Sequence, residues 1–188
     1  MEVRFRRDLP SVLYLGIILA SSHSMLIACN MNTLLLKTIL TVMVLLQPQA
    51  PWKDDYEQIS RGLLSGATTA PVFDGEYGVQ RTLALDISLA WFESRFDRHA
   101  TGDNGAAHGL YQVHAKEAET VEAQTIEANK LIKASFRICR NRPLEERLGW
   151  YASGGNGCDR PGGLKASRHR MLKAMWLYRK FFEGKPQD

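Results

Sequence analysis

The chain has 188 residues, of which 45% are hydrophobic, with 24 Lys and Arg against 20 Asp and Glu. A chain of this length holds one ordinary domain once a targeting segment has been set aside. From residue 51 to the end, 20 basic residues stand against 18 acidic ones and leave a formal charge of +2. Because this excess is small, we expect no nucleic acid among the partners of the protein.

Two apolar stretches dominate the first fifty positions, residues 11–20 with a loose extension and residues 34–46. Neither reaches the roughly 20 residues needed to cross a bilayer cleanly, and a signal peptide fits them better. One interpretation uses the first stretch and a Leu-Ile-Ala-Cys lipoprotein box at residues 26–29. The other starts translation at Met31 and is cleaved after Ala50. We favour the second, because an apolar run directly after a lipidated cysteine is unusual.

Residues 1–50 are therefore predicted to be a signal or targeting segment, with one or two membrane-anchoring helices as the alternative. In both cases residues 51–188 form a single domain that leaves the cytoplasm for the periplasm or the extracellular space. We expect this domain to be a monomer that stays at a membrane only if residues 1–50 remain attached.

Only Cys139 and Cys158 remain after residue 50. An even pair in a chain bound for an oxidising compartment predicts a disulfide. Closing a loop of about 20 residues stabilises a domain by about 3 kcal/mol in the chain-entropy estimate. A metal site is the competing interpretation, but the pair lacks Cys-x-x-Cys spacing and a nearby His pair, so we expect no metal.

After residue 51 the sequence predicts a mainly α fold, because apolar residues recur every three or four positions between glycine-rich breaks. The expected helices cover residues 54–66, 79–93, 121–139, 144–151 and 164–182. The polar segment 97–108, with Gly-Asp-Asn-Gly near its centre, predicts a tight loop or a small β-hairpin.

The last expected helix has a core-facing stripe and basic side chains elsewhere, as an amphipathic helix does. The stripe consists of Met171, Met175, Trp176, Tyr178 and Phe182, and the basic residues are Arg168, Arg170, Lys173, Arg179 and Lys180. We interpret the basic residues as a solvated face, and binding of an anionic wall polymer is the less favoured interpretation.

Glu93 is the residue to which we assign chemistry. It stands near the end of an expected helix, with Trp91 and Phe92 before it and Phe96 after it. An apolar environment and the negative end of a helix dipole both raise the pKa of a carboxyl group. Cleavage of a glycosidic bond needs such a carboxyl, because the acid must carry a proton near neutral pH.

The residues around Glu93 form a more specific pattern. Glu93-Ser94-Arg95-Phe96 precedes a loop, Gly102-Asp103-Asn104-Gly105, and is followed by Gly109-Leu110-Tyr111-Gln112 and, much later, by Trp150-Tyr151-Ala152-Ser153-Gly154. Over roughly residues 79–178 the chain resembles the lytic transglycosylase (SLT) family of the lysozyme-like superfamily. That family combines a Glu-Ser pair, a small-residue loop, a Gly-Leu-x-Gln element and a downstream Tyr-Asn-Ala-Gly-like element.

The resemblance implies a lysozyme-like helical domain that cleaves the glycan strands of peptidoglycan without a cofactor. It places the acid and base role on Glu93, a groove-lining role on Gln112, and a hydrogen bond near the catalytic carboxyl on Tyr151. The further substrate-binding positions that it implies are Ser94, Thr101, Gly109, Leu110 and Tyr111.

The chain departs from the family pattern at three places. The loop at residues 106–108 is one residue longer than the commonest form, and Thr101 or Gly102 stands where the family often has a substrate-contacting Ser. Ala152 and Ser153 stand where the family has Asn and Ala. Contacts at these positions therefore do not follow from the resemblance.

The reaction type depends on a second carboxylate. Hydrolysis needs one near the acid, whereas a lytic transglycosylase uses the C6 hydroxyl of the sugar and leaves a 1,6-anhydro-muramoyl end. The nearby candidates, Asp97 and Asp103, stand in a segment where Asp is common for backbone reasons. The sequence therefore favours a lytic transglycosylase that cleaves the MurNAc-GlcNAc β-1,4 bond. A goose-type or phage-like hydrolytic muramidase and a catalytically silent wall-binding or secretion-assembly scaffold are the alternatives.

Overall fold

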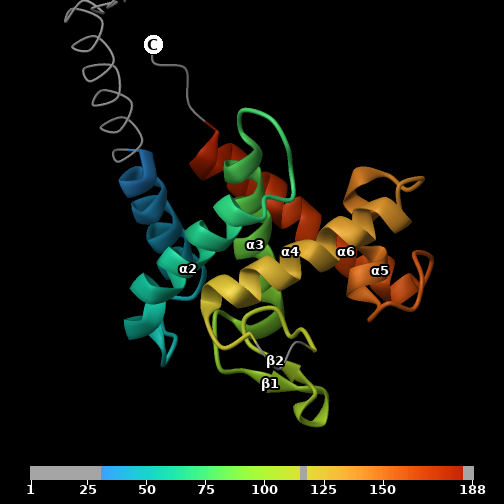
Figure 1. Cartoon of the computed structure of the whole chain (residues 1–188), viewed down its shortest axis with the longest axis horizontal. Helices are drawn as coiled ribbons and strands as arrows, with labels where there is room; N and C mark the ends of the chain where they lie inside the picture. Colours follow the sequence, from blue (N-terminus) through green and yellow to red (C-terminus); the bar gives the residue numbers. More distant parts are fainter. Residues whose placement is uncertain (1–30, 115–117, 184–188) are drawn as a thin grey trace, which may run out of the picture. The chain divides into compact units, whose positions relative to one another are not determined.

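The computed structural model describes residues 31–114 and 118–183. Within them the chain is mainly α-helical with one small two-stranded antiparallel sheet, which confirms the predicted fold class (Figure 1). Residues 31–46 are helical. The other elements, in chain order, are η1 (Lys53–Asp55), α2 (Tyr56–Thr69), α3 (Gly78–Ser94), β1 (Thr101–Gly102), η2 (Asp103–Gly105), β2 (Ala107–His108), α4 (Val121–Ile138), η3 (Leu144–Glu146), α5 (Gly149–Ala152), α6 (Pro161–Leu177) and the π-helical turn η4 (Tyr178–Phe182).

Most element boundaries agree with the prediction, and the main exception is the segment before the disulfide loop. The single helix expected over residues 144–151 is wrong, since η3 and the short α5 replace it. The helix is interrupted at Leu148, whose backbone N–H donates to Ser167 Oγ at 3.1 Å. α6 begins at Pro161, earlier than expected, because proline suits the first turn of a helix.

The predicted hairpin is present. β1 and β2 pair antiparallel, with Thr101 opposite His108 and Gly102 opposite Ala107. Between them Asn104 adopts a left-handed conformation with φ of 56°, which asparagine tolerates better than most residues. The loop expected at residues 97–108 therefore has the geometry that its composition indicated.

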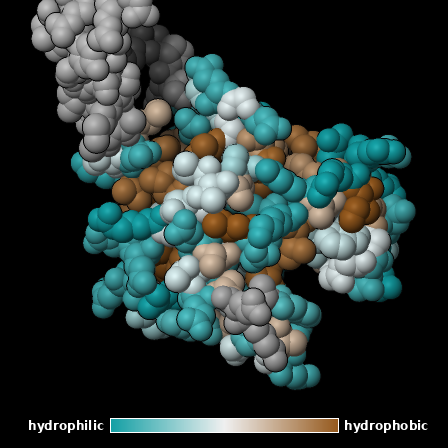
Figure 2. All heavy atoms as spheres, viewed as in Figure 1, coloured by the Kyte–Doolittle hydropathy of each residue, from teal (hydrophilic) through white to brown (hydrophobic). Residues whose placement is uncertain are grey.

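α3 is the central helix of the core. Every residue from 82 to 90 is buried, as expected for a helix enclosed by other elements. α2 and α6 pack against it, and the Ser88 hydroxyl donates to the Arg170 carbonyl of α6 at 2.8 Å. On the outer face drawn in Figure 2, hydrophilic side chains lie between the apolar ones. α3 thus runs through the interior and is accessible only near its two ends, the second of which contains Glu93.

α2 and α4 pack closely because α2 presents two glycines to α4. A Cβ atom on Gly62 would lie 2.5 Å from the Cβ of Val121, and one on Gly66 would lie 2.5 Å from the Cβ of Thr125. Real Cβ atoms do not approach this closely. The two glycines therefore set the distance between the helices, a role that the sequence pattern did not reveal.

The helix at residues 31–46 includes the predicted core of the signal peptide. The compact unit that contains the domain begins at Leu36, and the Tyr56 hydroxyl of α2 donates to the Gln47 carbonyl at 2.8 Å. Three side chains of this helix have no exposed surface: Ile39, Val42 and Met43. This segment is therefore packed in the structure, and processing after Ala50 stays a prediction.

No helix within residues 31–114 and 118–183 is long and apolar enough to cross a membrane. The other targeting interpretation, with the apolar stretch at 11–20 and the lipoprotein box at 26–29, lies outside the described residues. The signal peptide and the membrane anchor both stay open as predictions.

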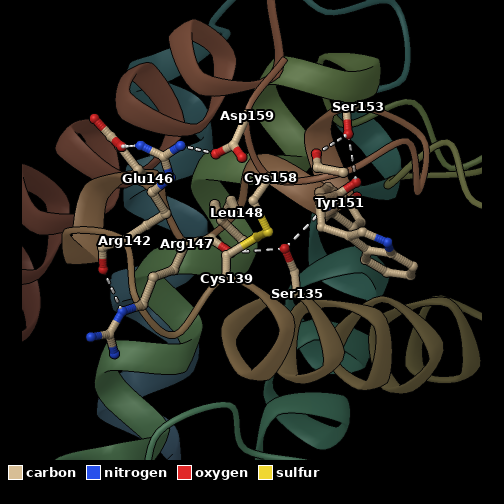
Figure 3. Close-up of a disulfide and its surroundings, with 12 residues drawn as sticks. Ser135, Cys139, Arg142, Glu146, Arg147, Leu148, Tyr151, Ser153, Cys158 and Asp159 are labelled. Carbon is tan, nitrogen blue, oxygen red and sulfur yellow. Dashed lines mark hydrogen bonds and ion pairs between the residues drawn. A yellow bond between two sulfur atoms is a disulfide. The ribbon is translucent and has the colours of Figure 1, made fainter. Parts of the chain in front are cut away.

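Cys139 and Cys158 form the predicted disulfide, which joins the end of α4 to the loop after α5 (Figure 3). Beside it, Ser135 Oγ accepts from the Tyr151 N–H at 3.1 Å and donates to the Arg147 carbonyl at 2.8 Å. The disulfide and this serine together hold α5 against α4. Disulfides persist in oxidising compartments, so the pair is consistent with an exported protein.

The last helix buries a different stripe from the one expected. The buried side chains are Ser167, Met171, Ala174 and Leu177, and Phe182 comes next in η4. Because these residues are three or four positions apart, Trp176 falls beside the stripe and is 44% exposed. Its assignment to the core was therefore wrong. Arg170, expected on a solvated face, instead has a side chain that is only 14% exposed.

We predict that Gly66→Ala lowers the free energy of unfolding by about 1–3 kcal/mol, because its methyl group would overpack the contact with Thr125. Gly162→Ala is the matched control, since a Cβ at this position of α6 meets no atom within 4 Å. The control substitution should leave the free energy of unfolding unchanged or raise it by up to about 1 kcal/mol. Urea unfolding of both variants measures the difference, and equal stabilities would contradict close packing of α2 on α4 at Gly66.

Candidate active site

An open cleft of about 560 Å³ contains the carboxyl to which the sequence assigned chemistry. Its walls come from the end of α3, the hairpin with the segment after it, α4, α5 and α6. Four of the predicted site residues line it, namely Glu93, Tyr111, Gln112 and Tyr151. Residues that are up to 58 positions apart in the chain therefore meet at one cleft.

Glu93 stands in the last turn of α3, and the chain reverses directly after it. Arg95 and Phe96 have left-handed backbone conformations, with φ of 57° and 66°, and these end the helix. The Glu93 side chain is 18% exposed, and its Oε1 lies 2.7 Å from Nη2 of Arg170. A half-buried carboxyl at the edge of the cleft is thus held by a cation from α6.

Burial and Arg170 act on Glu93 in opposite directions. Loss of water around the carboxyl raises the pKa of Glu93 above its ordinary value, and this effect is the larger one. The charge and the hydrogen bond of Arg170 lower the same pKa without cancelling the effect of burial. The raised pKa of Glu93 agrees with the expectation from the apolar residues around it in the sequence. The contact of Arg170 with Glu93 was not predicted.

Tyr151 lies in α5 and brings a neutral hydroxyl to the cleft. The hydroxyl donates to the Tyr111 carbonyl at 3.1 Å. Burial raises the pKa of Tyr151, and the negative charge of Glu93 raises it further. Tyr151 therefore stays protonated, with its proton directed at the Tyr111 carbonyl, and a hydrogen bond near the Glu93 carboxyl stays a prediction.

Gln112 lines the cleft and also holds the hairpin in place. Its backbone is left-handed, with φ of 49°. Its side-chain Nε2 donates to the carbonyls of Ala100 and Gly109 at 3.1 and 3.0 Å. A Cβ on Gly102 would lie 2.3 Å from Gln112 Oε1, so a side chain at this position of β1 would displace the amide from its hydrogen bonds.

The remaining predicted residues lie outside the cleft lining. Leu110 has no exposed surface, its N–H donates to Gln124 Oε1 at 2.9 Å, and its carbonyl accepts from Ser94 Oγ at 3.0 Å. Gly109 is buried as well, and Thr101 is exposed on β1. Ser94, Gly109 and Leu110 therefore stabilise the segments that carry the cleft residues and do not line the cleft themselves. Direct substrate contacts by these residues or by Thr101 stay predictions.

Several residues that line the cleft were not proposed as site residues from the sequence. They include Trp150, Leu131, His114 and Arg170, whereas Asp103, which also lines the cleft, was a candidate second carboxylate. Arg170 is one of six Lys and Arg residues in the predicted last helix, and nothing in their spacing separates it from the others. Trp150 offered a signal, since it stands directly before Tyr151 in the family-like element.

A buried polar cluster lies in the core behind the cleft. Asp86 of α3 has no exposed surface, and its Oδ2 accepts from Asn129 Nδ2 at 3.3 Å. Burial raises the pKa of Asp86 well above its ordinary value. Thr125 of α4 lies 3.3 Å from the Tyr111 hydroxyl. This cluster connects α3 and α4 beneath the tyrosine that lines the cleft.

No protein family, curated protein or solved structure matches this chain. Among the residues that the structure describes, no group of three or more His, Cys, Asp and Glu side chains could hold a metal ion. The side chains of the cleft are the basis for the function proposed below.

We predict that Arg170→Gln raises the pKa of Glu93 further, because the substitution removes the positive charge that favours the carboxylate. The carboxyl titration followed by ¹³C NMR measures this shift. Arg168→Gln is the matched control, since Arg168 lies on the same helix and binds a different carboxylate, Glu146, at 3.1 Å. An unchanged Glu93 titration in Arg170→Gln, with the fold intact, would show that the ion pair does not form in solution.

Proposed function

We propose that the protein is an exported peptidoglycan lytic transglycosylase in which Glu93 is the acid and base. The observation that carries this proposal is the half-buried Glu93 carboxyl in an open cleft, together with Gln112 and Tyr151. These are the three residues to which the resemblance assigned roles, and they come from distant parts of the chain. An open cleft also suits a polymer better than an enclosed pocket would.

The reaction needs only one carboxyl. Protonated Glu93 gives its proton to the leaving glycosidic oxygen while the bond between that oxygen and the anomeric carbon breaks. The C6 hydroxyl of the same sugar forms a new bond to the anomeric carbon, and the Glu93 carboxylate takes the hydroxyl proton. The effective concentration of this hydroxyl is high because it belongs to the same ring.

Arg170 has a role in both halves of this cycle. It lies 2.7 Å from Glu93 Oε1 and so fixes the carboxyl in one orientation. After proton transfer it stabilises the carboxylate that remains, as a cation placed near a developing negative charge does. Burial keeps the pKa of Glu93 raised despite this charge, so the acid form stays accessible.

One observation favours the hydrolytic muramidase as a second candidate. Asp103 lines the same cleft as Glu93, so a second carboxylate faces the space where substrate would lie. Asp97, the other candidate from the sequence, does not line it and instead accepts a hydrogen bond from the His99 N–H at 2.8 Å. The alternative of hydrolysis therefore rests on Asp103 alone.

We predict that Glu93→Gln lowers the cleavage of purified peptidoglycan by a factor of about 10² or more, because the amide has no proton to transfer. Loss of turbidity measures the activity. The control is Glu127→Gln on the outside of α4, whose activity should equal that of the parent. More than a few per cent activity in a folded Glu93→Gln variant would refute the acid role, and an inactive parent protein would favour the silent scaffold.

The muropeptide products should end in 1,6-anhydro-muramic acid, which mass spectrometry detects as a loss of one water relative to a reducing end. Asp103→Asn should keep the cleavage rate within about tenfold of the parent, or about 1.4 kcal/mol of barrier. Asp97→Asn is the control in the same segment. Reducing ends together with near-complete loss of activity in Asp103→Asn alone would establish the hydrolytic muramidase instead.

A further inference from the structure

A row of aromatic rings and cations crosses the outer faces of α3 and α6. We call it the aromatic–cation row, and it consists of Trp91, Arg95, Lys173, Trp176, Lys180 and Phe181. Lys173 Nζ lies 5.0 Å from the ring centre of Trp91 and 4.7 Å from that of Trp176. Arg95 Cζ lies 4.2 Å from the ring centre of the same Trp91. The rings and cations thus alternate.

The row continues to the end of the last helix. Lys180 Nζ lies 5.2 Å from the ring centre of Trp176 and 5.7 Å from that of Phe181. The two rings meet edge to face with their centres 5.8 Å apart. Trp176 is 44% exposed, so this end of the row offers a large aromatic surface between two ammonium groups.

The other end of the row is linked to the lining of the cleft by side-chain contacts. The Trp91 and Phe92 rings lie 4.9 Å apart, and the guanidinium of Arg170 lies 5.9 Å from the Phe92 ring centre. Arg170 is the residue that binds Glu93 in the cleft. The contacts of Trp91 with Phe92, and of Phe92 with Arg170, therefore connect the aromatic–cation row to the residue that binds Glu93.

The cations of the row have no acidic partner in the described part of the chain. Each ion pair found there involves other residues, and Arg168 and Arg170 of the same helix are both paired. Arg95, Lys173 and Lys180 instead lie against aromatic rings. Their positive charge is therefore available to an external anion.

We propose that the aromatic–cation row binds the part of the peptidoglycan strand that extends beyond the cleft. The exposed ring of Trp176 contacts the apolar face of a sugar, and Lys173 and Lys180 bind the carboxylates of the stem peptides. This inference rests on the proposed function for the identity of the polymer. It uses charge complementarity and the side-chain contacts that link the row to the lining of the cleft.

The test measures binding without cleavage, with Glu93→Gln as the parent background. The row variant combines Lys173→Gln, Trp176→Ala and Lys180→Gln, and its co-sedimentation with purified sacculi should be weaker by about tenfold at low salt. The difference should shrink at high salt, because exposed charges are screened. The control combines Lys133→Gln, Leu172→Ala and Lys165→Gln, which removes as many cations and one exposed apolar side chain outside the row. Thermal unfolding checks that both variants are folded.

Two further ligands separate the possible sources of binding. On glycan strands stripped of their peptides by an amidase, the row variant should lose less affinity than on intact sacculi. Equal losses on both, or equal binding by the row variant and the control, would overturn the proposal. Weaker binding of the row variant to phosphatidylglycerol vesicles, with sacculus binding unchanged, would also overturn it and assign the row to a lipid surface.

The outcome is separable from the proposed function. If the unsubstituted protein does not cleave sacculi but the row variant still binds them more weakly than its control does, the cleavage proposal fails and the binding proposal stands. If cleavage occurs and the row variant binds as well as its control, the binding surface fails and the enzyme stands.

Discussion

The contact between Glu93 and Arg170 is the interaction on which the arrangement of the site depends. It joins the end of the buried helix α3 to α6 with a separation of 2.7 Å, and the Ser88 hydroxyl makes a second connection to the Arg170 carbonyl. Because α3 is enclosed along residues 82–90, its last turn has little freedom to move. The carboxyl is thus presented to the cleft in a fixed position, and this kind of preorganisation lets a single group serve as acid and then as base.

The wall of the cleft that α5 provides depends on covalent and polar constraints in addition to packing of α5 against α6. The Cys139–Cys158 disulfide and the Ser135 hydroxyl hold α5, a helix of only four residues, against α4. A helix this short has no stability of its own. The position of Tyr151 in the cleft therefore depends on the oxidised disulfide, which connects the expected export of the protein to the geometry of its site.

Periodicity and local chemistry were enough to predict a large part of the fold. The long helices, the hairpin, the disulfide and the raised pKa of Glu93 all depend on neighbours within a few residues or on an obligatory pairing. The contact of Arg170 with Glu93 was not predicted, because nothing in the sequence distinguishes this arginine from the other five Lys and Arg residues of the helix. Trp176 was misplaced, since the helix rotation that decides exposure is set by packing of Met171, Ala174 and Leu177.

Two carboxyls of α3 show how environment separates a structural acid from the acid that we propose to be catalytic. Asp86 and Glu93 are seven residues apart on the same helix, and burial raises the pKa of both. No cation among the residues that the structure describes acts on Asp86, and both Asp86 Oδ1 and Asn129 Oδ1 are buried without a hydrogen-bond partner. A proton on Asp86 supplies the donor that these two acceptors lack, so the neutral acid fits the site better than the carboxylate does. Glu93, in contrast, has Arg170 to stabilise its carboxylate and the cleft to exchange its proton. Of the two acids, only Glu93 can therefore change its protonation state without leaving a buried charge uncompensated, and this makes it the one suited to acid and base chemistry.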